Sequence, residues 1–178
     1  MIKVAILGAT GYTALESIKH LLRHPDVEIV AVTSRQEGNT LVSSVHPSLV
    51  GRLDLPLEDL KPEAVADRAD VVLCCLPHCA SASVVPTLLD CGARVVDLSA
   101  DYRLNDAPTY QEWYGQPHSD SARLGVTVYG LPELFRENIT DATLVANPGC
   151  YATAAILPLA PLVNCLLYTS DAADDGLS

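Results

Sequence analysis

The chain opens on an apolar run that leads into a glycine-rich turn, and no other feature constrains its fold as strongly. Residues 2–8 read IKVAILG, a continuous apolar segment typical of a parallel strand buried on both faces. The turn GATGYTA follows, and residues 12–24 then place apolar side chains at helical spacing. This order predicts a dinucleotide-binding βα unit, in which N–H groups at the helix N-terminus hold a pyrophosphate. The alternative is a plain tight turn without a ligand.

The alternation of strands and helices continues along the chain. Residues 101–121 are polar and aromatic and predict a long loop with a short helix. The pattern as a whole predicts an α/β fold with a doubly wound, mostly parallel sheet of the Rossmann type. Further strands are predicted at 27–35, 70–77, 93–100, 126–134 and 142–147, and residues 54–60 are predicted to hold a short strand and a turn. Helices are predicted at 61–69 and at 79–92, where Pro86 could kink the helix.

The end of the second predicted strand indicates which dinucleotide is bound. An NAD-binding unit usually has an acidic residue there, which holds the ribose 2′-hydroxyl. This chain has Ser34 and Arg35 instead, and an arginine suits a 2′-phosphate through charge-assisted hydrogen bonds. The predicted cofactor is therefore NADP(H). A solvated surface arginine is the alternative.

Charge and apolar patterning exclude several classes of partner. The 178-residue chain has a formal net charge of −11, which argues against a nucleic-acid-binding surface, since contacts to phosphates supply most of such affinity. Its apolar runs are shorter than the roughly 18 residues that a membrane span needs. The N-terminus enters a strand directly, without the apolar region of a signal peptide. We therefore expect a cytoplasmic protein that binds neither membrane nor nucleic acid.

The six cysteines predict neither a disulfide framework nor a metal site. Their spacing is irregular, and although CCLPHC brings Cys75, His78 and Cys79 together, no second Cys/His pair follows at zinc-site spacing. Adjacent Cys74 and Cys75 would also point to opposite faces of a strand. We interpret these two as small buried side chains.

The segment NPGCYAT, residues 147–153, sets Cys150 between an apolar strand and an apolar helix. The N-terminus of a helix favours the thiolate form of a cysteine, which is the nucleophilic form. Cys150 is therefore the predicted nucleophile, with a buried structural cysteine as the alternative. None of the five histidines is a convincing general base, and His78 is better explained as a cofactor contact.

Six motifs over residues 1–163 carry a family resemblance: GATGYTA, TSR, LPH, SADYRL, YGLPEL and NPGCYAT, in this order. In this combination the chain resembles the N-acetyl-γ-glutamyl-phosphate reductases of arginine biosynthesis, and SADYR and NPGCYAT are the most specific motifs. Two positions depart from the family: Ala14 stands where a third glycine is common, and Ala152 where proline is usual. Neither change removes a reacting group.

The resemblance implies NADPH-dependent reduction of N-acetyl-γ-glutamyl phosphate to N-acetylglutamate 5-semialdehyde and phosphate, through a thioester on Cys150. It implies substrate contacts near the nicotinamide, with Arg103 on a carboxylate or phosphate group. The implied cofactor contacts are Gly8, Thr10, Gly11, Tyr12, Thr13, Ser34, Arg35, Leu76, Pro77 and His78, and the implied substrate contacts are Ser99, Asp101, Arg103 and Asn147.

The resemblance also implies a division into domains. Residues 1–149 would form the NADP-binding domain, and residues 150–164 would begin an α+β catalytic and dimerisation domain that lies mostly downstream with its catalytic histidine. Residues 165–178, CLLYTSDAADDGLS, are unlike the family and resemble a translated transposase adapter from DNA library preparation; a divergent tail is the alternative. On this interpretation the chain alone is inactive, and the full-length protein is a homo-oligomer.

Other functions stay open at this point. Aspartate-semialdehyde dehydrogenases share a GATG turn and a cysteine nucleophile, but SADYRL, TSR and NPGCYAT fit the acetylglutamyl-phosphate family better. A relative that acts on carrier-bound aminoadipyl phosphate is closer still. A non-catalytic NADP-binding module with a structural Cys150 is the hypothesis from a different class.

Overall fold

A computed structural model describes residues 1–35 and 39–165 of the chain. In this part the strands form one seven-stranded sheet in the order β3-β2-β1-β4-β5-β7-β6, and every pair of neighbours runs parallel. The doubly wound Rossmann-type sheet is thereby confirmed. The strands are β1 (Ile2–Leu7), β2 (Val27–Thr33), β3 (Leu57–Glu58), β4 (Val71–Cys74), β5 (Arg94–Asp97), β6 (Val128–Tyr129) and β7 (Leu144–Ala146).

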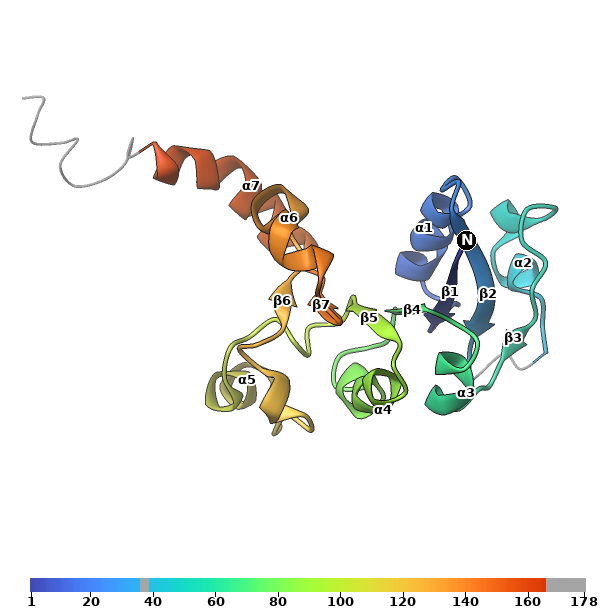
Figure 1. Ribbon diagram of the computed structural model, residues 1–178, viewed down its shortest axis with the longest axis horizontal. Coiled ribbons are helices and arrows are strands. Elements are labelled where there is room, and N and C mark those ends of the chain that lie inside the picture. Colours follow the sequence, from blue (N-terminus) through green and yellow to red (C-terminus); the bar gives the residue numbers. More distant parts are fainter. Residues whose placement is uncertain (36–38, 166–178) are drawn as a thin grey trace, which may run out of the picture.

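Helices lie on both faces of the sheet. Figure 1 shows α3, α4 and α5 in a row on one side of the strands, with α6 and α7 on the other. The α-helices are α1 (Tyr12–Leu21), α2 (Val42–Val45), α3 (Pro62–Ala66), α4 (Val85–Asp90), α5 (Ala107–Tyr114), α6 (Pro132–Thr140) and α7 (Cys150–Asn164), and the 3₁₀ turns are η1 (Pro47–Leu49), η2 (Ser81–Ser83) and η3 (Ser121–Arg123).

Each face of the sheet has its own apolar core. Side chains of β1 alternate between them: Leu7 packs with the cluster under α3, α4 and α5, while Ile6 packs with the cluster under α1 and α2. Because successive strand residues point to opposite faces, a strand covered on both sides must be apolar throughout. This explains the uninterrupted apolar run at the start of the chain.

The strand order places a crevice at the middle of the sheet. The connections from β1 lead outward to β2 and β3, whereas β4 lies on the other side of β1 and leads to β5. In open parallel sheets, ligands bind at the carboxyl ends of the strands where the order reverses. Here that point lies between the ends of β1 and β4, at Gly8 and Cys75.

Three predictions of secondary structure were wrong in detail. The predicted helix at 79–92 is divided into η2 and α4, and Pro86 lies in the first turn of α4 instead of kinking a longer helix. The predicted strand at 126–134 is limited to β6, because the chain turns at Gly130 and Pro132 starts α6. The first helix ends at Leu21 and not at His24.

The last helix differs from the others in its surroundings. None of the residues of α7 is buried, although its sequence is apolar, and Tyr151 and Val163 are 90% and 63% exposed. Of the predicted tail at 165–178, only Cys165 belongs to the described residues, and it is exposed. Among the described residues, no helix combines the length and apolarity that crossing a bilayer would require.

Candidate active site at the carboxyl ends of the strands

The glycine turn lies where two strand ends approach each other closely. Gly8 has φ +76°, and a Cβ atom built on it would be 2.5 Å from the carbonyl oxygen of Cys75. Only glycine combines that left-handed backbone with this contact. Gly11 then precedes α1 as its N-cap residue, in an extended conformation without a side-chain cap. The first N–H groups of α1 therefore remain available to an anion.

A cavity of about 440 Å³ opens beside this turn. Its walls come from the ends of β1, β2, β3 and β4, which the parallel sheet brings to one edge. Seven predicted cofactor residues line it: Gly8, Thr10, Gly11, Ser34, Arg35, Leu76 and Pro77. The other lining residues were missed: Leu7, Thr33, Asp59, Leu60, Pro62, Cys75, Ala80, Ser83 and Val84.

The remaining predicted cofactor residues lie next to the cavity without lining it. Tyr12 and Thr13 begin α1 and are exposed, as is His78 after Pro77. The backbone N–H of Ala100 donates to Nδ1 of His78 at 3.1 Å. The proton of a neutral His78 ring is therefore on Nε2, which makes this nitrogen a hydrogen-bond donor and not a base.

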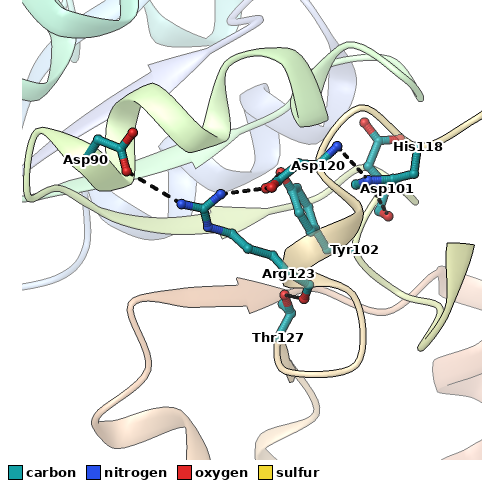
Figure 2. A network of polar contacts seen from close by, with 7 residues as sticks. All are labelled: Asp90, Asp101, Tyr102, His118, Asp120, Arg123 and Thr127. Atoms are coloured by element: carbon teal, nitrogen blue, oxygen red, sulfur yellow. Dashed lines mark hydrogen bonds and ion pairs between the residues drawn. The ribbon is translucent and has the colours of Figure 1, made fainter.

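His118, which contacts the loop after β5, is engaged at both ring nitrogens. It is 8% exposed; Nε2 donates to the Asp101 carbonyl at 2.9 Å, and Nδ1 accepts from the backbone N–H of Asp120 at 3.0 Å. Figure 2 shows His118 between these two partners. Neither His78 nor His118 therefore offers a free ring lone pair for general-base catalysis.

The same network fastens the loop after β5 to the rest of the domain. The Asp120 carboxylate accepts from the Tyr102 hydroxyl and from Arg123, each at 2.8 Å, and Arg123 also reaches Asp90 at 3.5 Å (Figure 2). Burial, and next the hydrogen bond to Asp120, raise the pKa of Tyr102, so this hydroxyl stays protonated and keeps donating. The loop is thus held against α4.

Ser99 and Asp101, the predicted substrate contacts, both make hydrogen bonds within the domain. The Asp101 carboxylate is fully buried and accepts from the backbone N–H groups of Cys79 and Ala82 and from the Tyr110 hydroxyl, at 2.7, 2.9 and 3.1 Å. Its oxygens therefore fasten the start of η2 and are not open to a substrate.

Ser99 is tied to the end of β5 in a similar way. Its hydroxyl donates to the carboxylate of Asp97 at 2.7 Å and accepts from the N–H of Asp101 at 3.0 Å. Burial raises the pKa of Asp97, and the hydrogen bonds from Ser99 offset part of that rise. The serine thus supports the loop that leads to Arg103.

Arg103 joins the ends of two strands and reaches the turn before Cys150. Its Nε donates to the carbonyl of Asn147 at 2.8 Å, and Nη2 donates to the carbonyl of Leu98 at 3.0 Å. Nη1 would lie 3.1 Å from a Cβ atom at Gly149. The guanidinium therefore brings a positive charge to the residue before the predicted nucleophile, and Gly149 leaves room for it.

Cys150 is the first residue of α7, after Gly149 as the N-cap residue. Because β7 runs parallel to β5 and β4, Cys150 emerges at the same sheet edge as the glycine turn. Cys150 is exposed. Cys74 and Cys75 pack into different apolar clusters, as predicted; burial raises the pKa of Cys74, and that of Cys75 to about 11.

These environments predict an order of thiol reactivity. We expect iodoacetamide to modify Cys150 at least about 10-fold faster than Cys75 or Cys74, because alkylation needs an accessible thiolate. Cys91 is the matched control, since it is also exposed but lies at the carboxyl end of α4, where the helix dipole disfavours an anion. Peptide mapping by mass spectrometry after brief labelling measures the order. Modification of Cys91 before Cys150 would contradict it.

Comparison with known proteins identifies the family that this chain matches. Residues 3–142 match the family described as semialdehyde dehydrogenase, NAD binding domain. The chain is 50% identical over 178 residues to an N-acetyl-γ-glutamyl-phosphate reductase from Rhodopirellula baltica, covering 99% of this chain and 51% of that protein. It is 53% identical over 164 residues to one from Citrifermentans bemidjiense, covering 92% and 47%. The chain spans about half the length of the curated relatives it matches.

A solved structure agrees with the fold. Aspartate semialdehyde dehydrogenase with NADP from Candida albicans superposes with a TM-score of 0.62 at 19% identity, over 92% of this chain and 47% of that chain. At this level of identity the likeness extends to the fold alone.

Proposed function

The chain belongs to the semialdehyde dehydrogenase family through its NAD-binding domain, and from this premise we propose that the complete protein is an N-acetyl-γ-glutamyl-phosphate reductase. The observation that carries the proposal is the position of Cys150. It begins α7 at the sheet edge that also holds the dinucleotide cavity, with the Arg103 guanidinium against Gly149. Two relatives that are 50% and 53% identical to this chain are named for the same activity, which supports the proposal.

The cavity fits an NADP(H) cofactor. Gly8 leaves space that a Cβ atom would close, and the N-terminus of α1 offers N–H groups for a pyrophosphate. Arg35 lies in the wall formed by the end of β2, where it would hold a 2′-phosphate. When bound, NADPH supplies a hydride to the carbonyl carbon held on Cys150.

Arg35 gives the cofactor preference a direct test. We expect Arg35→Ala to weaken NADPH binding by about 10- to 100-fold, the range of one hydrogen bond to a charged group, and to leave NADH binding unchanged. Fluorescence titration of both cofactors against parent and variant measures this. Equal affinities of the parent for the two cofactors would remove Arg35 from the role.

Residues of this chain would carry the covalent step. The Cys150 thiolate attacks the acyl carbon, the bond to the phosphate oxygen breaks, and phosphate leaves with its electron pair, so that a thioester forms. Hydride addition converts the thioester to a thiohemiacetal. Its collapse releases the semialdehyde and restores the thiolate. The positive charge of Arg103 would bind the phosphate or carboxylate of the substrate.

We further propose that the division into domains falls at Cys150. His78 and His118 are engaged elsewhere, so the general base would come from residues beyond 164 of the complete protein, and the exposed apolar side chains of α7 would meet that second domain. The complete enzyme would be a homo-oligomer. Because the substrate is a charged acyl phosphate and does not cross bilayers, we propose that the enzyme acts in the cytoplasm.

The complete enzyme tests the proposal in the oxidative direction. We expect phosphate-dependent reduction of NADP with N-acetylglutamate semialdehyde, and much slower reduction with aspartate semialdehyde or an aminoadipate semialdehyde. Reversal of this preference would overturn the proposed substrate. The absence of turnover with every semialdehyde, while NADPH still binds, would favour a non-catalytic binding module.

A further inference from the structure

A buried histidine outside the cavity contacts the backbone of the glycine turn. His46 is 7% exposed, and its Nε2 lies 2.8 Å from the carbonyl oxygen of Ala9. A carbonyl oxygen can only accept, so Nε2 carries the proton and donates. The bond joins the segment between α2 and η1 to the turn after β1, which are far apart in the sequence.

The support of His46 is rigid. Its backbone N–H donates to the carbonyl of Val42, and its own carbonyl accepts from the N–H of Leu49, both at 2.9 Å. Val42 and Leu49 are fully buried in the same apolar cluster as Ala9. Pro47 restricts the backbone of the residue before it. The backbone of His46 is therefore held in place, which fixes the position from which the imidazole reaches Ala9.

The contact fixes the orientation of one peptide plane. Ala9 is fully buried, and its N–H donates to the carbonyl of Thr33 at 2.9 Å, while its carbonyl accepts from His46. In a trans peptide, the carbonyl of Ala9 and the N–H of Thr10 lie in one plane and point in opposite directions. Holding the oxygen toward His46 therefore directs the Thr10 N–H away from His46, and Thr10 itself lines the cavity.

We propose that His46 is a positioning residue for the pyrophosphate of the dinucleotide. This rests on the proposed function, in which the cavity holds NADPH. With the peptide held as it is, an N–H faces the anion and can form a charge-assisted hydrogen bond. If this peptide flipped, the partly negative Ala9 oxygen would face the negatively charged phosphate, and the two would repel each other. In the part of the chain that the structure describes, Thr10 N–H has no other partner, so it is available to the ligand.

Two amide substitutions and two ligands test the role in the full chain. Glutamine places an amide N–H close to the position of Nε2, whereas the amide of asparagine is one methylene shorter and does not reach Ala9. We expect His46→Asn to weaken NADPH binding about 10-fold, the scale of one hydrogen bond to a charged group. His46→Gln should restore most of that loss. Binding of adenosine 2′-monophosphate, which lacks the pyrophosphate, should hardly change in either variant.

His118→Asn is the matched control. His118 is equally buried and donates from Nε2 to the carbonyl of Asp101 at 2.9 Å, but it does not line the cavity. The His118→Asn variant should be less stable in urea melts and keep the parent's ratio of affinities for NADPH and adenosine 2′-monophosphate. If His46→Asn lost equal affinity for NADPH and for adenosine 2′-monophosphate, or if the Asn and Gln variants bound NADPH equally well, the positioning role of His46 would be overturned and the proposed function would stand. A parent chain that binds neither ligand would overturn the proposed function as well.

Discussion

Replacement of Cys150 by serine in the complete enzyme should lower turnover by about 10⁴-fold or more, the scale seen when a nucleophile of a coupled catalytic unit is removed. A serine hydroxyl at the first position of α7 stays protonated at neutral pH, and the ring nitrogens of His78 and His118 that could accept its proton already accept backbone N–H groups. NADPH affinity should stay unchanged, because Cys150 does not line the dinucleotide cavity. Steady-state rates and fluorescence titration separate the two effects.

Cys91→Ser is the control for this substitution. Cys91 is exposed, as Cys150 is, but it ends α4, away from the residues that line the cavity. We expect its activity to equal that of the parent. If Cys150→Ser kept activity within about tenfold of the parent, the thioester route would be excluded, because a single nucleophile cannot be lost at so small a cost.

The central strands could be predicted because burial on both faces leaves a simple pattern. β1, β2, β4 and β5 lie side by side in the sheet and were all recognised as apolar runs. The edge strands β3 and β6 have two residues each. β3 lies in the segment predicted to hold a short strand and a turn, whereas β6 was predicted too long. Helix α6 was missed, since Pro132 was included in a strand although it begins the helix.

The candidate site was predictable where its residues directly follow a strand. Gly8, Arg35 and Leu76 come after β1, β2 and β4, and parallel strands bring those ends to one edge. His46 comes from a connecting segment, and its approach to Ala9 depends on how α2 and η1 pack, for which the sequence has no periodic signal. The hydrogen bonds that Asp101 makes depend on packing in the same way.

Asp101 shows how a motif can mislead about contact. Its position near Arg103 in SADYR suggested a substrate ligand, yet its carboxylate is buried against the N–H groups of Cys79 and Ala82. One of these N–H groups lies before η2 and the other inside it, and each needs an acceptor when it is withdrawn from water. In the motif SADYR, Asp101 therefore holds the loop in place, while Arg103 brings its positive charge to the turn before Cys150.

Gly8→Ala should cost about 3 kcal/mol of unfolding free energy or more and weaken NADPH binding more than about 100-fold. An alanine in the left-handed region costs about 1–2 kcal/mol by itself. The added Cβ would also meet the Cys75 carbonyl at 2.5 Å, and that backbone cannot retreat easily, because the Cys75 N–H donates to the Leu7 carbonyl at 2.9 Å. Relief requires the turn to move, which displaces the N–H groups that face the pyrophosphate.

Gly92→Ala separates the two contributions to this loss. Gly92 has φ +89°, but nothing lies within 4 Å of a Cβ atom built on it, and it is not among the residues that line the cavity. It should therefore lose only the conformational cost of about 1–2 kcal/mol and bind NADPH like the parent. Urea melts and cofactor titrations of both variants measure the difference. Equal destabilisation of the two variants, with parental NADPH affinity in both, would mean that the β1–β4 contact does not hold the turn in place for the dinucleotide.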